Sequence, residues 1–332
     1  MNKLRRCLDS AKGGGVVEWC LQPSPSNTLE TLVISDVTSD DCEFIGSGPT
    51  FLTSYTCKPA LRAIEDAMGS PPPVEGEEAG LLRDVVGFLT YKGDRELGGV
   101  REGREGYNEP SVISSNKMMV RSVADRIREI GGEVRIFRDG DMEGEARVVG
   151  VELVDALEKQ GAGKGTFLIA GGETTVTFCS ALGNGKGGRN QEMALAMALE
   201  LSKRDMDDVV AVCFGTDGND GPTDAAGAIV DGTTVRKIWE QAKERGGAKD
   251  AVEYAKVRMG EERRTREASS LMMFYTIHQP PLLVALLLAP LHSSQSYLER
   301  HDAYNYFAGS EYLIKCGATG TNVADVVVLS RM

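Results

Sequence analysis

Apolar runs and amphipathic patterns alternate along the second half of the chain. Short apolar runs predict strands at residues 111–116 and 133–137, and helical patterns follow at 118–131 and 144–160. The apolar face of the first predicted helix consists of Val120, Val123, Ile127 and Ile130. Strands that alternate with helices at this spacing favour an α/β fold with a doubly wound, mostly parallel sheet.

The stretch from residue 168 to residue 231 continues this rhythm and carries most of the reactive side chains. Apolar runs at 168–178 and 209–214 flank a helical pattern at 193–203, and each run leads into a polar, glycine-rich turn. These turns hold Glu173, Arg189, Glu192, Asp217, Asp220 and Asp224. Because ligands of open α/β sheets bind beyond the carboxyl ends of the strands, the pattern predicts a site at these turns.

Glycines at the turns leave room for a ligand to approach the backbone, since they have no Cβ. Gly171 and Gly172 follow the first apolar run, and Gly187 and Gly188 precede Arg189. A helix that starts at Arg189 offers N–H groups, a guanidinium and the helix dipole to one anion, which suits a phosphate. The alternative is that the glycines only form turns and that the charges are solvated.

A second motif fits the same loop. Gly183, Gly185 and Gly188 match the dinucleotide pattern G-x-G-x-x-G, and Asp208 follows at the spacing of its ribose-binding acid. The first turn of the next helix is polar, whereas that motif needs small or apolar residues there. The motif alone therefore keeps a nicotinamide-dinucleotide site as an alternative. A P-loop is excluded, because Gly187 stands where that motif needs Ser or Thr.

Acidic residues at two strand ends have two interpretations. Asp217, Asp220 and Asp224 could hold Mg²⁺ or orient a substrate hydroxyl opposite the basic loop, or they could cap turns and a helix. Asp36 ends the run TLVISDV at 31–37, which we expect to be a buried parallel strand. It is either a functional acid or a turn cap.

The remaining segments are less regular. Residues 1–15 predict a short basic helix, and 69–110 a linker or surface excursion with an amphipathic piece at 81–89. Residues 260–297 join a charge run to apolar residues that prolines interrupt, and no part of them is long enough for a membrane helix. Two strand patterns close the chain, at 312–317 and 323–329.

Composition limits the possible partners. The chain has 332 residues, 41% of them hydrophobic, and a formal net charge of −12, which argues against nucleic acid or an anionic membrane as a partner. Seven cysteines include no C-x-x-C pair, so neither a disulfide framework nor a zinc site is indicated. The N-terminus lacks the apolar core of a signal peptide, and we expect a cytoplasmic protein.

Several long motifs resemble one family. GGETTVTF, GGRNQE, GTDGNDGPTDAAGAIVDGTT and GATGTNVADV resemble the MOFRL domain of the glycerate 2-kinase family. SDVTSDDCEFIGSGPT and NKLRRCLDSAKGG resemble the end of the N-terminal domain of that family. The resemblance divides the chain into a remnant of that Rossmann-like domain at 1–68, the linker at 69–110 and a MOFRL-type domain at 111–332, with an atypical insertion at about 260–297.

The resemblance implies an enzyme that phosphorylates D-glycerate to 2-phosphoglycerate with ATP and Mg²⁺. Asp36 and Arg189 match essential polar groups of the interdomain cleft: Asp36 would orient the 2-hydroxyl group, and Arg189 would hold the substrate carboxylate or the phosphate. The residues expected to bind substrate or phosphate are Gly171, Gly172, Glu173, Gly187, Gly188, Asn190, Glu192 and Asn322. Those expected to bind Mg²⁺ are Asp217, Asp220 and Asp224.

The chain also departs from the family. Most of the N-terminal domain of the family, with much of its nucleotide site, has no counterpart before Met1; Ser39 replaces a usual glycine, and Ala318 a usual proline. We therefore expect an incomplete glycerate kinase and leave open whether this chain alone is active. Two alternatives are kept: an NAD(P)-dependent hydroxypyruvate reductase, which would act on a related three-carbon acid, and a noncatalytic fragment or faulty gene model. The oligomeric state is not predicted.

Overall fold

A computed structural model describes residues 1–21, 27–68, 78–98, 106–161, 163–178, 185–244 and 294–332. These residues form two compact units, Met1–Ser115 and Asn116–Met332. The insertion predicted at about 260–297 lies almost wholly outside the described residues, as does Gly183 of the dinucleotide motif. Among the described helices, none has the length and apolar composition needed to cross a membrane.

The N-terminal unit has a small helical core. Its elements are α1 (Asn2–Leu8), α2 (Gly15–Leu21), β1 (Leu32–Ile34), η1 (Ile45–Ser47), β2 (Ser54–Tyr55), α3 (Lys58–Met68), α4 (Glu78–Lys92), β3 (Leu97–Gly98) and β4 (Ser111–Ser114). Helices α1, α3 and α4 contribute Cys7, Ile64 and Leu89 to one apolar cluster. The short basic helix predicted near the N-terminus is thus present as α1. Helix α4 falls within the predicted linker and is longer than the amphipathic piece at 81–89.

The strand predicted around Asp36 differs from expectation. Strand β1 pairs in parallel with β4, as a parallel strand should, and β2 pairs antiparallel with β3. The prediction that β1 is buried is wrong for this structure, because Leu32 is 63% and Ile34 is 43% exposed. A two-stranded sheet without further layers packed on both faces leaves such side chains exposed.

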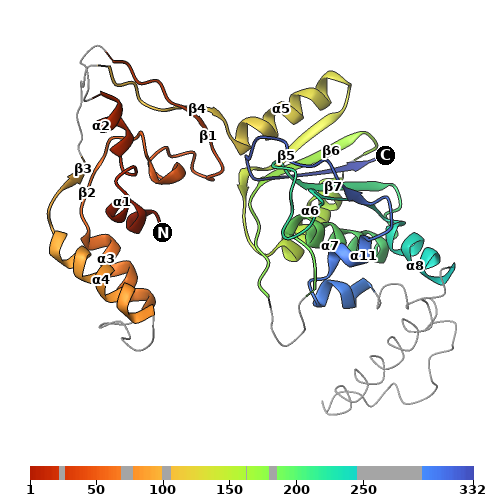
Figure 1. The fold of residues 1–332 in the computed structure, drawn as a ribbon. Coiled ribbons are helices and arrows are strands. Elements are labelled where there is room, and N and C mark those ends of the chain that lie inside the picture. The colour runs from red at the N-terminus through yellow and green to blue at the C-terminus, as the bar shows by residue number, and fades with distance from the viewer. Residues whose placement is uncertain (22–26, 69–77, 99–105, 162, 179–184, 245–293) are drawn as a thin grey trace. The chain divides into compact units, whose positions relative to one another are not determined.

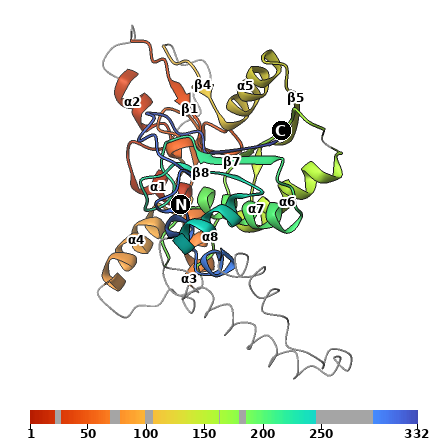
Figure 2. The same ribbon diagram turned by 90° about the vertical axis from the view of Figure 1, so that its right-hand side faces the viewer.

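The C-terminal unit is a six-stranded sheet with the order β5-β6-β10-β7-β8-β9. Its elements are α5 (Asn116–Glu129), β5 (Glu133–Met142), α6 (Ala146–Lys159), β6 (Thr166–Gly172), α7 (Arg189–Lys203), β7 (Val209–Gly215), β8 (Gly227–Asp231), α8 (Thr234–Glu244), α11 (Ala303–Phe307), β9 (Leu313–Ile314) and β10 (Asp325–Arg331). Helices cover both faces: in Figure 1, α5 lies above the sheet and α6 and α7 lie below it, and the turned view in Figure 2 shows the same arrangement.

The α/β class is confirmed, and the sheet is mixed. Strands β5 and β6 pair in parallel, whereas β10 is antiparallel to both β6 and β7. The three strands that alternate with helices therefore share one direction, as the pattern predicted. Strand β10 lies between β6 and β7 and runs in the opposite direction. Strand β8 is antiparallel to β7, because the connection between them is too short for a helical crossover.

Helix α5 and strand β6 pack closely. Val120, Ala124 and Ile127 of α5 are buried and form one cluster with Ile169 of β6. The predicted apolar face is thus correct in its centre. Ile130 is 68% exposed, because it lies beyond the last residue of the helix.

Helix α7 is buried on almost every side. Eleven of its residues are buried, among them three alanines whose small side chains allow close packing. On the neighbouring helix α6, a Cβ at Gly150 would lie 3.0 Å from the carbonyl oxygen of Met193. This close fit fixes the position of α7 and of its first residue, Arg189.

A carboxylate from another loop caps α7. Asp220, in the loop after β7, accepts hydrogen bonds from the backbone N–H groups of Asn190 (3.1 Å) and Gln191 (2.9 Å). The side-chain amide of Gln191 donates to the same carboxylate at 2.9 Å. Gly188 makes room for the cap, because a Cβ there would lie 2.3 Å from Asp220 Cγ. The negative charge also complements the helix dipole.

We expect Gly171→Ala to destabilise the C-terminal unit. A Cβ at Gly171 would lie 2.2 Å from Asn116 Oδ1 and 2.4 Å from Val120 Cγ2, so α5 would have to move. The expected loss in the free energy of unfolding, measured by chemical denaturation, is about 1–3 kcal/mol. Gly163→Ala is the control, since a Cβ there meets no atom within 4 Å. Equal stability of the two variants would contradict the packing described for Gly171.

We expect Asp220→Ala to lower the free energy of unfolding by about 2–3 kcal/mol, because a buried charged cap is lost. The control is Asp224→Ala, which removes a carboxylate of the same loop whose side chain is 63% exposed. Thermal and chemical denaturation should show a much smaller loss for the control. A comparable loss in both variants would show that the cap adds nothing.

The cap should also titrate at a raised pH. Burial raises the pKa of Asp220 above its ordinary value of 3.8, and the charge of Asp325 raises it further against the lowering effect of the N–H groups. The folded chain then binds this proton more tightly than the unfolded chain, so the contribution of Asp220 to stability falls as the pH rises from 3.8 through the folded pKa. A carboxyl ¹³C NMR titration should give a midpoint above 3.8 for Asp220; a midpoint at or below it would contradict this account.

Candidate active site

The site is built around Arg189, the first residue of α7. Its Nε donates to Asp325 Oδ2 at 2.5 Å, and its Nη2 donates to Asp325 Oδ1 at 3.0 Å. Asp325 is the first residue of β10 and is 0% exposed, whereas the Arg189 side chain is 34% exposed. A carboxylate removed from water requires such a partner, and the two parallel hydrogen bonds fix the plane of the guanidinium.

Sequence reasoning missed Asp325. In the sheet it pairs with Gly172 at the end of β6 and with Gly215 at the end of β7. The carboxyl ends of two strands and the start of a third therefore meet at this residue. The available signal was an acid that opens the apolar run DVVVL of the last strand. This signal points to the site only when it is known that the last strand lies between β6 and β7.

Glu173 contacts the other end of the guanidinium. Its Oε1 lies 3.1 Å from Arg189 Nη1, and its side chain is 51% exposed. Burial lowers the pKa of Arg189, but the hydrogen bond and charge of Asp325, followed by the charges of Glu173 and Asp220, outweigh it and raise the pKa. Arg189 thus stays a cation, with its Nη1 end turned toward the exposed Glu173.

Asn190 joins the two buried acids. Its side-chain Nδ2 donates to Asp325 Oδ1 at 3.0 Å and to Asp220 Oδ1 at 3.3 Å. Asn190 itself is 1% exposed. It therefore orients the carboxylates behind Arg189, and the structure gives it no direct part in the ligand set.

The predicted glycines serve packing. Gly171 faces Asn116 and Val120, and a Cβ at Gly172 would lie 2.4 Å from backbone atoms of Met142. The carboxylate of Asp220 lies against Gly188 at the start of α7, where we expected a phosphate. Both oxygens of Asp220 accept hydrogen bonds there, which also leaves them unsuited to bind a metal.

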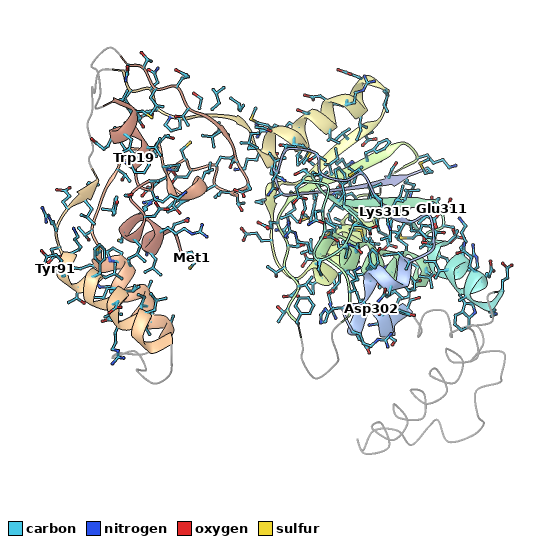
Figure 3. All side chains as sticks on the ribbon, viewed as in Figure 1. Met1, Trp19, Tyr91, Asp302, Glu311 and Lys315 are labelled. Carbon is cyan, nitrogen blue, oxygen red and sulfur yellow. The ribbon has the colours of Figure 1, made fainter. Side chains whose placement is uncertain are left out.

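Glu192 is enclosed in a buried network. Its Oε1 accepts a hydrogen bond from Arg147 Nε at 2.8 Å, and its Oε2 lies 2.9 Å from His301 Nδ1. Nearby, Asp302, labelled in Figure 3, accepts a hydrogen bond from the backbone N–H of Lys186 at 2.8 Å. Glu192 therefore holds Arg147 and His301 in place, whereas Asp302 holds the loop at Lys186, and we leave Glu192 out of the ligand set.

The other predicted acids, Asp217 and Asp224, have different partners. Asp224 pairs on the surface with Lys315 Nζ at 2.9 Å, a lysine labelled in Figure 3, and with Tyr304 at 2.7 Å. Asp217 is half-buried just beyond β7, where its Oδ1 accepts the N–H of Asn219 at 2.9 Å. Within the described ranges, no three His, Cys, Asp or Glu side chains are grouped to hold a metal ion.

Two predicted residues remain. Asn322 Oδ1 accepts the N–H of Ala324 at 3.0 Å, so it shapes the turn that leads into β10. Asp36 lies in the N-terminal unit, exposed just after β1. The structure therefore brings together Arg189, Glu173, Asn190 and Asp220 among the predicted residues, and adds Asp325.

Two family models match the chain. Residues 166–257 match the MOFRL family, and residues 1–74 match a domain of unknown function, DUF4147. The first match covers β6, α7, β7 and β8, and so includes Arg189 and the Asp220 cap.

Named relatives are glycerate kinases. The chain is 33% identical over 249 residues to the glycerate 2-kinase of Pyrococcus horikoshii, covering 73% of this chain and 52% of that protein. It is 28% identical over 337 residues to the D-glycerate 2-kinase of Thermotoga maritima, covering 99% of this chain and 61% of that protein. The chain thus spans about half to three fifths of the length of these relatives.

The structure agrees with these matches. It superposes on the crystal structure of the Thermotoga maritima glycerate kinase with a TM-score of 0.67 and 26% identity, over 100% of this chain and 63% of that one. The chain is therefore a relative of the glycerate kinases, through the DUF4147 domain at residues 1–74 and the MOFRL family at residues 166–257.

Proposed function

We propose that this chain belongs to an ATP-dependent phosphotransferase that converts D-glycerate to 2-phosphoglycerate, with Arg189 as its anion-binding cation. The observation that carries the proposal is the guanidinium held in a fixed plane by buried Asp325 at the carboxyl ends of β6 and β7. Ligands of α/β sheets bind at this edge. The names of the relatives supply the substrate class.

Phosphoryl transfer depends mainly on positioning and on charge stabilisation. In the proposed reaction the 2-hydroxyl oxygen of glycerate attacks the γ-phosphorus of ATP, and the bond from that phosphorus to the β–γ bridging oxygen breaks. Arg189 binds the substrate carboxylate or the phosphoryl group in transfer. On the family resemblance alone, Asp36 is the residue that we propose to orient the hydroxyl group and to accept its proton.

Mg²⁺ remains a proposal that we rest on Asp217. Magnesium in kinases is bound by one or two carboxylates together with substrate phosphates. Asp217 fits that requirement, because it is half-buried at a strand end. Among the described residues, only its Oδ1 has a hydrogen-bond partner, the N–H of Asn219. The carboxylate of Asp220 caps α7, and that of Asp224 pairs with Lys315 on the surface. Bound Mg²⁺ would neutralise charge on the phosphates.

No observation favours the hydroxypyruvate reductase. The acid that a dinucleotide site would need, Asp208, immediately precedes β7, whereas the candidate site follows the other end of that strand at Gly215. A cytoplasmic location, and the exclusion of nucleic acid and membrane as partners, remain predictions from the sequence.

We expect Arg189→Ala to lower turnover about 10²–10³-fold, the usual cost of removing one key electrostatic donor. The measurement is ADP release by the purified chain with Mg-ATP and D-glycerate, with 2-phosphoglycerate identified by NMR. The control is Arg204→Ala at the other end of α7, which also removes an arginine with several acidic partners, among them Asp155 and Glu200. Unchanged turnover in Arg189→Ala would refute the role of Arg189.

The same assay tests the activity of the chain alone. Should the unaltered chain release no ADP, it is repeated with the chain preceded by the N-terminal region of the Thermotoga maritima relative. Activity that appears only then would support the expected incompleteness. No turnover in either form would favour the noncatalytic alternative.

A further inference from the structure

The two acidic partners of Arg189 differ in kind. Asp325 binds the guanidinium through Nε and Nη2 and is 0% exposed. Glu173 reaches only Nη1, at 3.1 Å, and its side chain is 51% exposed. A buried bidentate pair resists exchange with solvent, whereas an exposed single contact is screened by water and competes with other anions.

The backbone at Glu173 is fixed while its side chain has room to move. Its N–H donates to the carbonyl oxygen of Met142 at 2.8 Å, and the N–H of Thr175 donates to that of Gly144 at 2.8 Å. Between them Thr174 is 2% exposed. Release of Arg189 by Glu173 therefore needs only a side-chain rotation, which exposed residues perform within picoseconds to nanoseconds.

The charged groups around Arg189 determine which end of its guanidinium an anion can reach. Behind the guanidinium lie Asp325 and Asp220, both buried and both fully hydrogen-bonded. Within the part of the chain that the structure describes, only the Nη1 end contacts an exposed acid, Glu173. An anion that arrives from solvent therefore meets Arg189 at the position that Glu173 occupies.

We propose that Glu173 is an exchangeable partner of Arg189: it pairs with Nη1 until an anionic substrate replaces it, while Asp325 stays bound and positions the guanidinium. The inference rests on the proposed function for the identity of the anion, a carboxylate or a phosphoryl group. Glu173 is then a residue that sets affinity, and Asp325 a positioning residue. The exchange lowers affinity for anions, because each ligand must displace an internal carboxylate.

The test is Glu173→Gln, which keeps the shape of the side chain and removes its charge. With ¹⁵N-arginine-labelled chain, the Nε–H signal of Arg189 is followed by NMR during titration with D-glycerate and, separately, with inorganic phosphate. We expect Glu173→Gln to bind the anion about two- to five-fold more tightly than the unaltered chain, the range of an exposed ion pair. In an active form of the enzyme, KM for glycerate should fall with little change in kcat.

The matched control is Glu143→Gln. Glu143 is exposed, follows β5 near the same edge of the sheet, and no ion pair joins it to Arg189 in the described chain. It should change affinity less than Glu173→Gln does. Equal effects of the two variants would mean that general charge explains the change, and would overturn the exchange.

Other outcomes separate this inference from the proposed function. Tighter binding of phosphate by Glu173→Gln without any response to D-glycerate would support the exchange and contradict the proposed substrate. Weaker anion binding by Glu173→Gln would overturn the exchange, since Glu173 would then belong to the ligand-binding set. No response of Arg189 to either anion in either protein would also overturn it.

Discussion

The site depends on keeping two carboxylates out of water. Asp325 and Asp220 are both buried, and each would be costly without partners. The first three residues of α7 supply those partners: Arg189 binds Asp325, Gln191 binds Asp220, and Asn190 binds both. One short segment thus satisfies two acids from different parts of the chain. The position of α7 therefore depends on the loop after β7 and on the start of β10. The orientation of Arg189 is a result of this arrangement.

Much of the fold follows from the hydrophobic pattern. The alternation of runs and helices predicted α5, β5, α6, β6, α7 and β7 and their common strand direction, because most of these elements bury apolar side chains. It could not place β10 between β6 and β7. No local feature of a sequence specifies which strands will be neighbours in a sheet. Asp325, the principal partner of Arg189, was therefore not predicted.

The candidate site shows the same division. Polar residues at strand ends were expected to form one ligand site, yet several of them bind residues that were not predicted. Glu192 binds Arg147 and His301, and Asp224 binds Lys315. Glycines were expected to admit a ligand, whereas Gly171 and Gly188 admit Asn116 and Asp220. A sequence reveals where a Cβ is missing, but only the packed structure shows which atom fills the space.

The central position of β10 has a consequence for biosynthesis. Arg189 and Asp325 are separated by 136 residues, and β6 and β7 have no hydrogen-bonded neighbour between them until β10 has left the ribosome. Contacts between residues so distant in sequence form slowly, and unpaired strand edges can pair wrongly in the meantime. During translation the unfinished sheet therefore keeps two unpaired strand edges, and Arg189 reaches its partner Asp325 only after β10 has been made.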